Sequence, residues 1–115
     1  MPIGAKYVFM ASMDVAPEKE DLFNEVYDNE HIPNLLAVPG VLAVTRVRSE
    51  PFALSIGSEH KEMPAASPRY TAIYELESPD VLASDSWARA VEAGRWPGEV
   101  RPFTTNRRHA LVKVI

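Results

Sequence analysis

Residues 23–44 have the sequence FNEVYDNEHIPNLLAVPGVLAV, in which an amphipathic helix passes into a β-strand. Pro33 disfavours helical geometry in the residue before it, so the regular helix is expected to end near His31. A short second turn follows, and the Pro-Gly pair at 39–40 ends that turn before the strand begins. Apolar side chains recur at the spacing of one helical face at Leu22, Phe23, Val26 and Tyr27.

On either side of this segment, β-branched and aromatic runs indicate further strands, and a Pro followed by acidic residues indicates where each helix begins. The order along the chain is strand, helix, strand, strand, helix, strand. This order predicts a ferredoxin-like βαββαβ fold of the α+β class, with an antiparallel four-stranded sheet and two helices on one face. We expect strands at residues 6–16, 41–48, 70–77 and 104–115, helices that start at residues 17 and 79, and a stop to the second helix at residues 94–98.

The chain of 115 residues has the length of one domain, so residues 1–115 are expected to share a single core. The connection at residues 49–68 is much longer than a hairpin loop and contains three Pro, which suggests either a functional loop or a floppy one.

Composition excludes several classes of protein. The chain has no Cys, which removes disulfides and thiolate metal sites and favours a reducing, cytoplasmic location. The net charge of −4 argues against nucleic acid as a partner, and no apolar run is long enough for a membrane span. Acidic residues are concentrated at 14–30 and basic residues at 95–113, either as solvated surfaces or as complementary patches across a subunit contact.

Both sides of the first strand are largely apolar. Because the two helices cover one face of the sheet, the other face needs a partner, most simply a second copy packed sheet to sheet in a homodimer. A shift of one residue in register would exchange the two sides, so the sequence leaves open which side lines a pocket. One side carries Tyr7, Phe9, Ala11 and Met13, and the other carries Val8, Met10 and Ser12.

Two adjacent residues near the end of the first helix are candidates for acid–base chemistry. At 100° per residue Glu30 falls inside the apolar stripe, where a carboxylate needs a partner or a wet cavity, unless the helix frays and turns it to solvent. His31 lies at the edge of the stripe near Tyr27 and Asn24 and is a plausible general acid or base. The structural alternative is that His31 bonds a carbonyl at the helix end.

Aromatic side chains are numerous enough to line a pocket for a flat ligand, although such residues more often simply form the core. The basic run Arg107-Arg108-His109 either clamps an acidic ligand or charges a sheet edge. The sequence contains no glycine-rich phosphate loop, GxSxG or CxxC motif, and its His residues are dispersed, so we expect no metal and no cofactor. The candidate pocket walls are Tyr7, Phe9, Tyr74 and Trp87.

The segment at 23–44 resembles the signature of EthD-like proteins in the dimeric α/β barrel superfamily. In that signature a Tyr or Trp, a Glu-His pair and a Pro end the first helix, and Pro-Gly leads into the second strand. The matching residues are Tyr27, Glu30, His31, Pro33, Pro39 and Gly40.

The resemblance covers the whole element order and implies a dimeric barrel. Members of the superfamily include polyketide cyclases, cofactor-free monooxygenases, lactone isomerases and haem-handling enzymes. Haem chemistry is disfavoured, because the haem-degrading members typically place an Asn on the first strand and a His on the second helix, and this chain has neither.

We therefore expect a homodimer that binds a small aromatic or polyketide-like molecule. In this hypothesis His31 is the acid or base of a cyclase, dehydratase, isomerase or monooxygenase, Glu30 orients or charge-balances His31, and Tyr27 and Asn24 hydrogen-bond the substrate. The alternative is a non-catalytic accessory or ligand-binding homodimer, and a third possibility is a dimer whose pocket is filled by its own side chains.

Overall fold

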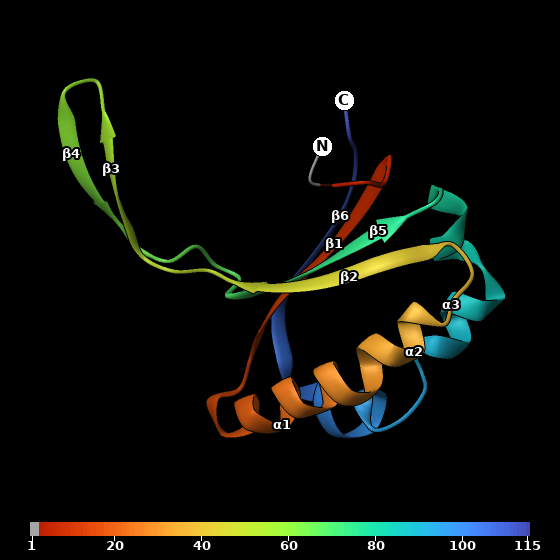
Figure 1. Ribbon diagram of the computed structural model, residues 1–115. Helices are drawn as coiled ribbons and strands as arrows, with labels where there is room; N and C mark the ends of the chain where they lie inside the picture. Colours follow the sequence, from red (N-terminus) through yellow and green to blue (C-terminus); the bar gives the residue numbers. More distant parts are fainter. Residues whose placement is uncertain (1–2) are drawn as a thin grey trace.

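The main sheet contains four antiparallel strands in the order β2-β5-β1-β6, which confirms the predicted ferredoxin-like topology (Figure 1). A computed structural model describes residues 3–115. All of the helices pack on one face of this sheet (Figure 1). The strands are β1 (Tyr7–Val15), β2 (Val41–Arg48), β5 (Tyr70–Leu76) and β6 (Thr104–Lys113), close to the predicted ranges.

The first helical segment does not end near His31 but continues to Leu36. A 3-10 turn (Pro17–Lys19) leads into α1 (Glu20–Val26), a π-turn (Tyr27–His31) and α2 (Ile32–Leu36). Pro33 lacks an N–H group, and its ring would clash with a carbonyl four residues earlier in a regular helix. The wider π-turn, in which the Ile32 N–H donates to the Tyr27 carbonyl, carries the chain past Pro33.

The second helical region begins with a 3-10 turn (Pro79–Ala83) and continues as α3 (Asp85–Ala90). Ser84 caps α3, because its side-chain oxygen accepts a hydrogen bond from the Trp87 N–H at 3.1 Å. After residues 94–95 the chain forms a further π-turn (Trp96–Val100) and a 3-10 turn (Arg101–Phe103). This additional helical segment was not predicted, and it buries Trp96 and Val100 against the core.

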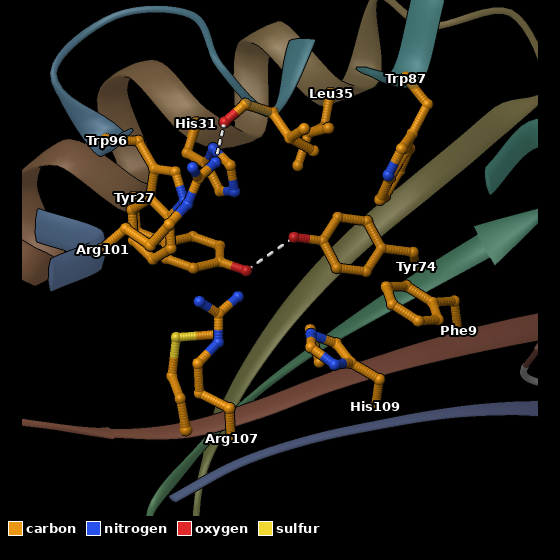
Figure 2. Close-up of a pocket in the computed structure, with 13 residues that line it drawn as sticks. Phe9, Tyr27, His31, Leu35, Tyr74, Trp87, Trp96, Arg101, Arg107 and His109 are labelled. Carbon is orange, nitrogen blue, oxygen red and sulfur yellow. Dashed lines mark hydrogen bonds between the residues drawn. The ribbon is translucent and has the colours of Figure 1, made fainter. Parts of the chain in front are cut away.

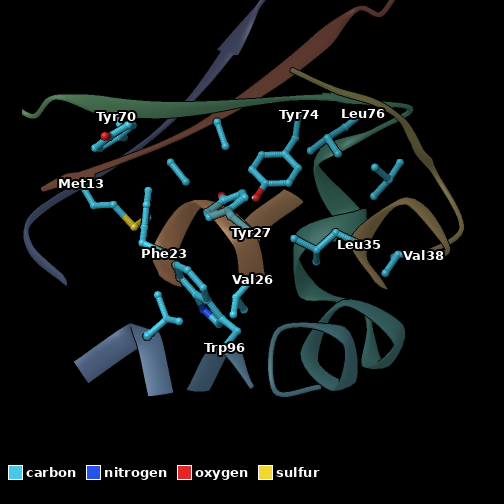
Figure 3. Packing of buried hydrophobic residues seen from close by; sticks show 14 of the residues in the cluster. Met13, Phe23, Val26, Tyr27, Leu35, Val38, Tyr70, Tyr74, Leu76 and Trp96 are labelled. Carbon is cyan, nitrogen blue, oxygen red and sulfur yellow. The ribbon is translucent and has the colours of Figure 1, made fainter. Parts of the chain in front are cut away.

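The core lies between the sheet and the helices (Figure 3). On β5 buried and partly buried residues alternate strictly, and the buried ones, from Tyr70 to Leu76, point toward the helices. The register pairs Phe9 with Tyr74 and Ala11 with Ala72. The structure therefore decides which side of β1 faces the helices: it is the side that carries Phe9, Ala11 and Met13.

The connection at residues 49–68 is a structured arm rather than a loop. It contains β3 (Phe52–Ile56) and β4 (Glu59–Met63), which form a separate two-stranded sheet. This hairpin projects away from the body and lies on the side of the main sheet opposite the helices (Figure 1). Every residue of both strands is exposed.

Candidate functional site

A cavity of about 220 Å³ lies between the helices and the sheet. One part of its wall comes from the first helical segment, one from the segment 87–101, and one from β1, β5 and β6 (Figure 2). The lining residues are Phe9, Ala11, Met13, Tyr27, His31, Leu35, Tyr74, Trp87, Val91, Trp96, Arg101, Arg107 and His109.

His31 is a buried polar residue in this wall, only 4% exposed. Its ring stacks on Trp96, with ring centres 4.3 Å apart, and meets the edge of Tyr27 at 4.9 Å. The Nδ1 atom is buried and has no hydrogen-bond partner among residues 3–115, so the alternative in which it bonds a carbonyl at the helix end is not observed. Burial, together with the nearby charges of Arg101 and Arg107, lowers the pKa of His31 to about 4. The imidazole is therefore neutral at pH 7.

The π-turn explains why His31 is buried and Glu30 is not. A turn closed by bonds from residue i to i+5 contains more residues than the 3.6 of an α-helix, so each residue advances by less than 100° around the axis. On a regular helix Glu30 would lie near the centre of the apolar stripe and His31 at its edge. The smaller advance moves His31 toward the centre and Glu30 toward the edge.

The prediction that Glu30 orients or charge-balances His31 is corrected by this geometry, because Glu30 binds Arg95 instead. Its Oε1 atom accepts a hydrogen bond from the Arg95 backbone N–H at 3.0 Å, and its Oε2 atom accepts one from Arg95 Nε at 2.6 Å. These hydrogen bonds from Arg95 lower the pKa of Glu30. Glu30 reaches the backbone there because residue 94 is Gly: it has a positive φ of 70°, and a Cβ would lie 2.7 Å from the Glu30 carboxylate. The Glu30–Arg95 pair thereby positions Trp96, which covers one face of the His31 ring.

Two tyrosine hydroxyls meet in the cavity. The Oη atoms of Tyr27 and Tyr74 are 2.6 Å apart and hydrogen-bond to each other (Figure 2). Burial raises the pKa of Tyr27 to about 12 and, with the influence of Tyr27, raises the pKa of Tyr74 further. Both hydroxyls are therefore protonated at neutral pH. Tyr27 was predicted to lie near a substrate and Tyr74 to form a wall; the structure adds that the two act as one polar group.

The cavity also has a cationic side, formed by Arg101 and by Arg107 of β6. Arg101 donates a hydrogen bond from Nη1 to Glu92 Oε2 at 3.0 Å and another from Nη2 to the Val91 carbonyl at 2.6 Å. Arg107 has no carboxylate within ion-pairing distance among the described residues, and its side chain points into the cavity (Figure 2). Strand alternation places Arg107 and His109 on the cavity side of β6 and Arg108 on its other side. The basic run in the sequence does not show this separation.

Other predicted residues are divided between the cavity and the surface around it. Phe9 and Trp87 line the cavity, where Phe9 stacks on His109 with ring centres 5.7 Å apart. Asn24 does not line it, because its Oδ1 atom accepts a hydrogen bond from Arg46 Nη2 at 2.7 Å in a separate shallow groove. Tyr7 packs against the core on the same side of β1 but is not part of the cavity wall. Asn24 and Tyr7 therefore lie outside the cavity that the other predicted site residues line.

Sequence reasoning missed Trp96, Arg101 and Leu35 as cavity residues. Trp96 and Arg101 belong to the helical segment 96–103, which begins inside residues 94–98, where the sequence predicts a stop. No pattern in the sequence signals that Trp96 stacks on His31.

Across residues 3–115, no group of three His, Asp or Glu side chains is arranged to hold a metal ion. None of the helices in the described part of the chain is long and apolar enough to cross a membrane.

No protein-family model and no curated protein sequence matches the chain. Solved structures do match its fold. A variant of MhuD with two manganese protoporphyrin IX molecules per active site superimposes with a TM-score of 0.63 at 15% identity, covering 95% of this chain and 94% of that chain. An ethyl tert-butyl ether d (ethd) family protein from Bacillus halodurans matches with a TM-score of 0.57 at 15% identity, covering 95% and 99% of the two chains.

A variant of SnoaB, a cofactor-independent oxygenase from Streptomyces nogalater, matches with a TM-score of 0.57 at 18% identity, covering 96% of this chain and 94% of that chain. Identities this low establish a shared fold and no shared chemistry. The chain therefore has the ferredoxin-like α+β fold of the dimeric α/β barrel proteins, and an EthD family protein is among its structural neighbours.

Proposed function

We propose that the protein binds a small aromatic or polyketide-like molecule in the cavity between sheet and helices, and that His31 acts on it as a general acid or base without a cofactor. The observation that carries this proposal is His31, a buried imidazole in the cavity wall whose Nδ1 has no hydrogen-bond partner among the described residues. Buried polar atoms without a partner are rare in folded proteins, and at a cavity they commonly serve a ligand.

The chemistry begins with a neutral imidazole that accepts a proton from an O–H or an activated C–H of the ligand. From a C–H group, the electron pair left behind moves onto the ligand's carbonyl oxygen and gives an enolate; from a phenolic O–H group, it stays on that oxygen and gives a phenolate. In both cases His31 becomes an imidazolium. Return of the proton to a different atom of the ligand completes an isomerisation, and loss of water or closure of a ring can proceed from the same enolate. The aromatic walls, including Phe9 and Trp87, suit a planar ligand.

Oxygenation without a cofactor is the second candidate. An enolate or phenolate is an electron-rich species that O2 can attack, and forming it needs only the base described above. The fold likeness to SnoaB, described as a cofactor-independent oxygenase, and to a protein described as an antibiotic biosynthesis monooxygenase, with a TM-score of 0.54, favours this candidate over other reactions.

The cavity of this chain is small for haem. The volume of about 220 Å³ is below the roughly 300–1,000 Å³ typical of sites for drug-sized ligands. A porphyrin is larger than most such ligands, so we derive no step through haem despite the fold likeness to MhuD.

A non-catalytic binding or accessory role remains the alternative. It would require the same cavity but no proton transfer by His31. An assay of proton exchange therefore separates the two proposals.

The protein would act as a homodimer through the sheet face that the helices leave uncovered. Residues directly opposite each other in the register share a face, so Met10, Ile73 and Ala110 lie together on this side. Val47 and Val112, on the same face, are 44% and 41% exposed. An apolar sheet face of this kind is normally covered, and a second copy covers it most simply.

The test uses 2-tetralone, a planar bicyclic ketone with acidic C–H groups, in D2O. We expect the protein to accelerate deuterium uptake next to the carbonyl, followed by NMR, and His31→Gln to lower that acceleration by roughly 100-fold or more. His60→Gln, on the exposed hairpin, is the control and should exchange like the wild type. Exchange no faster than in buffer, with 2-tetralone bound, would favour the accessory role. Full exchange by a folded His31→Gln variant would remove His31 as the base.

A further inference from the structure

The Tyr27–Tyr74 pair in the cavity has one O–H group that does not donate within the pair. Tyr27 and Tyr74 are both protonated, and only one of their two O–H groups can donate to the other. The second O–H has no acceptor among residues 3–115. A buried hydroxyl without an acceptor is costly, so this proton is available to an acceptor atom on a ligand.

Arg107 adds a positive charge on the same side of the cavity. Its guanidinium points toward the two hydroxyls (Figure 2). The charge acts on the groups around the cavity: it adds to the lowering of the His31 pKa that burial causes, and it offsets part of the rise that burial causes in the pKa of Tyr27. No ion pair with the described residues neutralises it. This part of the wall therefore combines an O–H donor with guanidinium N–H donors and a net positive charge.

We propose that the cavity selects planar ligands that carry an anionic oxygen, such as a carboxylate, phenolate or enolate, and that this oxygen lies between the Tyr27–Tyr74 pair and Arg107. The inference rests on the proposed function and specifies its ligand class. Hydrogen bonds to an oxyanion from O–H and guanidinium donors are charge-assisted, and a partly buried cavity strengthens them relative to water. The same site would stabilise an enolate oxygen produced when His31 removes a proton.

Both Trp residues of the chain line this cavity, so their two indole N–H signals in a ¹H–¹⁵N NMR spectrum report on its occupancy. The probes are 2-naphthoate and 2-naphthamide, which have the same ring system and differ in charge. We expect the wild type to bind naphthoate roughly tenfold more tightly or better, since charge-assisted bonds are the stronger class. Arg107→Gln should remove this preference and leave the affinity for naphthamide unchanged.

Arg108→Gln is the matched control, because it changes the net charge by the same amount as Arg107→Gln. Arg108 lies opposite Ser12 in the strand register, on the other face of the sheet. It should retain the preference for naphthoate. Equal affinities for the two probes in the wild type would overturn the anion site and leave the planar-ligand cavity standing. A preference that survives Arg107→Gln would overturn the role of Arg107. The absence of any indole shift with either probe would contradict ligand binding in the cavity itself.

A second, independent observation concerns the β3–β4 arm. The radius of gyration is 15.8 Å, against about 13 Å for a compact domain of this length. The accessible surface is 7089 Å², whereas a monomer of 12.8 kDa is expected to expose about 6,300 Å². This excess of about 800 Å² is of the same order as the area that one partner contributes to a standard protein–protein interface.

One side of the arm, called its apolar side, carries all of the large apolar residues of the hairpin. Phe52, Leu54 and Ile56 alternate along β3, and Met63 pairs with Phe52, so these four side chains share one face. The ion pair Lys61–Glu59 lies on the same face, opposite Leu54 and Ile56. They are 36–57% exposed. An isolated two-stranded hairpin is at best marginally stable in water, so a ribbon that exposes this face needs something to pack against.

The base of the arm is held firmly to the sheet. Asp14 accepts hydrogen bonds from the Arg69 N–H at 2.7 Å and from Asn106 Nδ2 at 3.0 Å. Asn106 Nδ2 also donates to Ser67 Oγ at 2.8 Å, and the Ser49 N–H donates to the Arg69 carbonyl at 2.8 Å. These bonds direct the arm to the side of the sheet that carries the uncovered apolar face (Figure 1).

We infer that the apolar side of the arm packs on a second copy of this chain that is docked on the uncovered sheet face. This rests on the proposed homodimer and adds the arm to its interface. The test is sedimentation equilibrium of the wild type and of Phe52→Lys/Ile56→Lys. We expect a wild-type dimer and a dimer dissociation constant raised roughly ten- to a hundredfold in the variant.

Ala53→Lys/Ser55→Lys places the same charges on the opposite side of the hairpin and should dimerise like the wild type. A control variant that dissociates as much as Phe52→Lys/Ile56→Lys would overturn the inference. A tight dimer of Phe52→Lys/Ile56→Lys would also overturn it while leaving the sheet-to-sheet dimer in place. A monomeric wild type would remove the homodimer and the role of the arm together.

Discussion

Trp96→Ala is expected to lower the free energy of unfolding by about 3–5 kcal/mol, the cost of truncating a large buried aromatic residue. Trp96 is 2% exposed and its ring contacts Phe23, Tyr27 and His31, with centre distances of 6.0, 5.1 and 4.3 Å. The substitution therefore removes core packing and opens one face of His31. Because a domain of this size has a stability of roughly 5–15 kcal/mol, the loss would be a large fraction of the total.

Urea unfolding followed by far-ultraviolet circular dichroism measures this loss at a fixed protein concentration, which matters if the protein dimerises. Trp87→Ala is the control, because Trp87 lies at the cavity but is only partly buried. We expect it to be clearly less destabilising. A loss below about 1 kcal/mol in Trp96→Ala, or one no larger than in Trp87→Ala, would contradict the packing role given to Trp96.

The second large effect is a dependence of stability on pH that originates at His31. The folded protein holds the pKa of His31 at about 4, below the usual value of 6.5, because burial and nearby arginines disfavour the imidazolium. Between pH 6.5 and 4 the unfolded chain therefore binds a proton that the folded chain does not. Stability falls as the pH is lowered through this window and levels off below the folded pKa. Between pH 7.5 and 5.0 the contribution of His31 is about 2 kcal/mol.

The measurement compares the unfolding free energies of the wild type and His31→Gln at pH 7.5 and pH 5.0. The wild type should lose about 2 kcal/mol more than the variant over this interval. His109→Gln is the control, since His109 is exposed and its change should be smaller. The pKa values of Asp14 and Glu30 are lowered, so protonation of these carboxylates destabilises the fold only at more acidic pH. Their contribution is the same in the wild type and in His31→Gln, and it cancels in the comparison. Parallel pH dependence in the wild type and His31→Gln would show that His31 is not held neutral by the fold.

Much of the architecture could be predicted from local patterns. Strands such as residues 41–48 and the apolar stripe of the first helix depend on neighbours that are close in sequence, and periodicity reports them directly. Part of the candidate site could also be predicted from the sequence. The helical pattern puts Tyr27 and His31 on one helix, and Phe9, Tyr74 and Trp87 are predicted pocket walls; all five residues line the cavity.

The rest could not be predicted because it depends on partners distant in sequence. Glu30 looked like a companion for His31, but Arg95, 65 residues away, binds it through backbone and side chain. Arg107 lines the cavity because its position in β6 puts its side chain on the face of the sheet that the helices cover. A shift in register between β1 and β6 near Ser12 and Asp14, at which Asn106 adopts a positive φ of 51°, adjusts the pairing just before Arg107.

By itself the sequence determined the order of the elements and a Tyr and a His on one helix near Pro33. The tertiary structure alone decided which side of β1 faces the helices, how the π-turn rotates His31 into the wall, and which residues from β5, β6 and the segment 94–101 meet it there. The physical reason is that secondary structure follows from interactions within a few residues. A site, in contrast, depends on register, burial and charge among segments that only folding brings together.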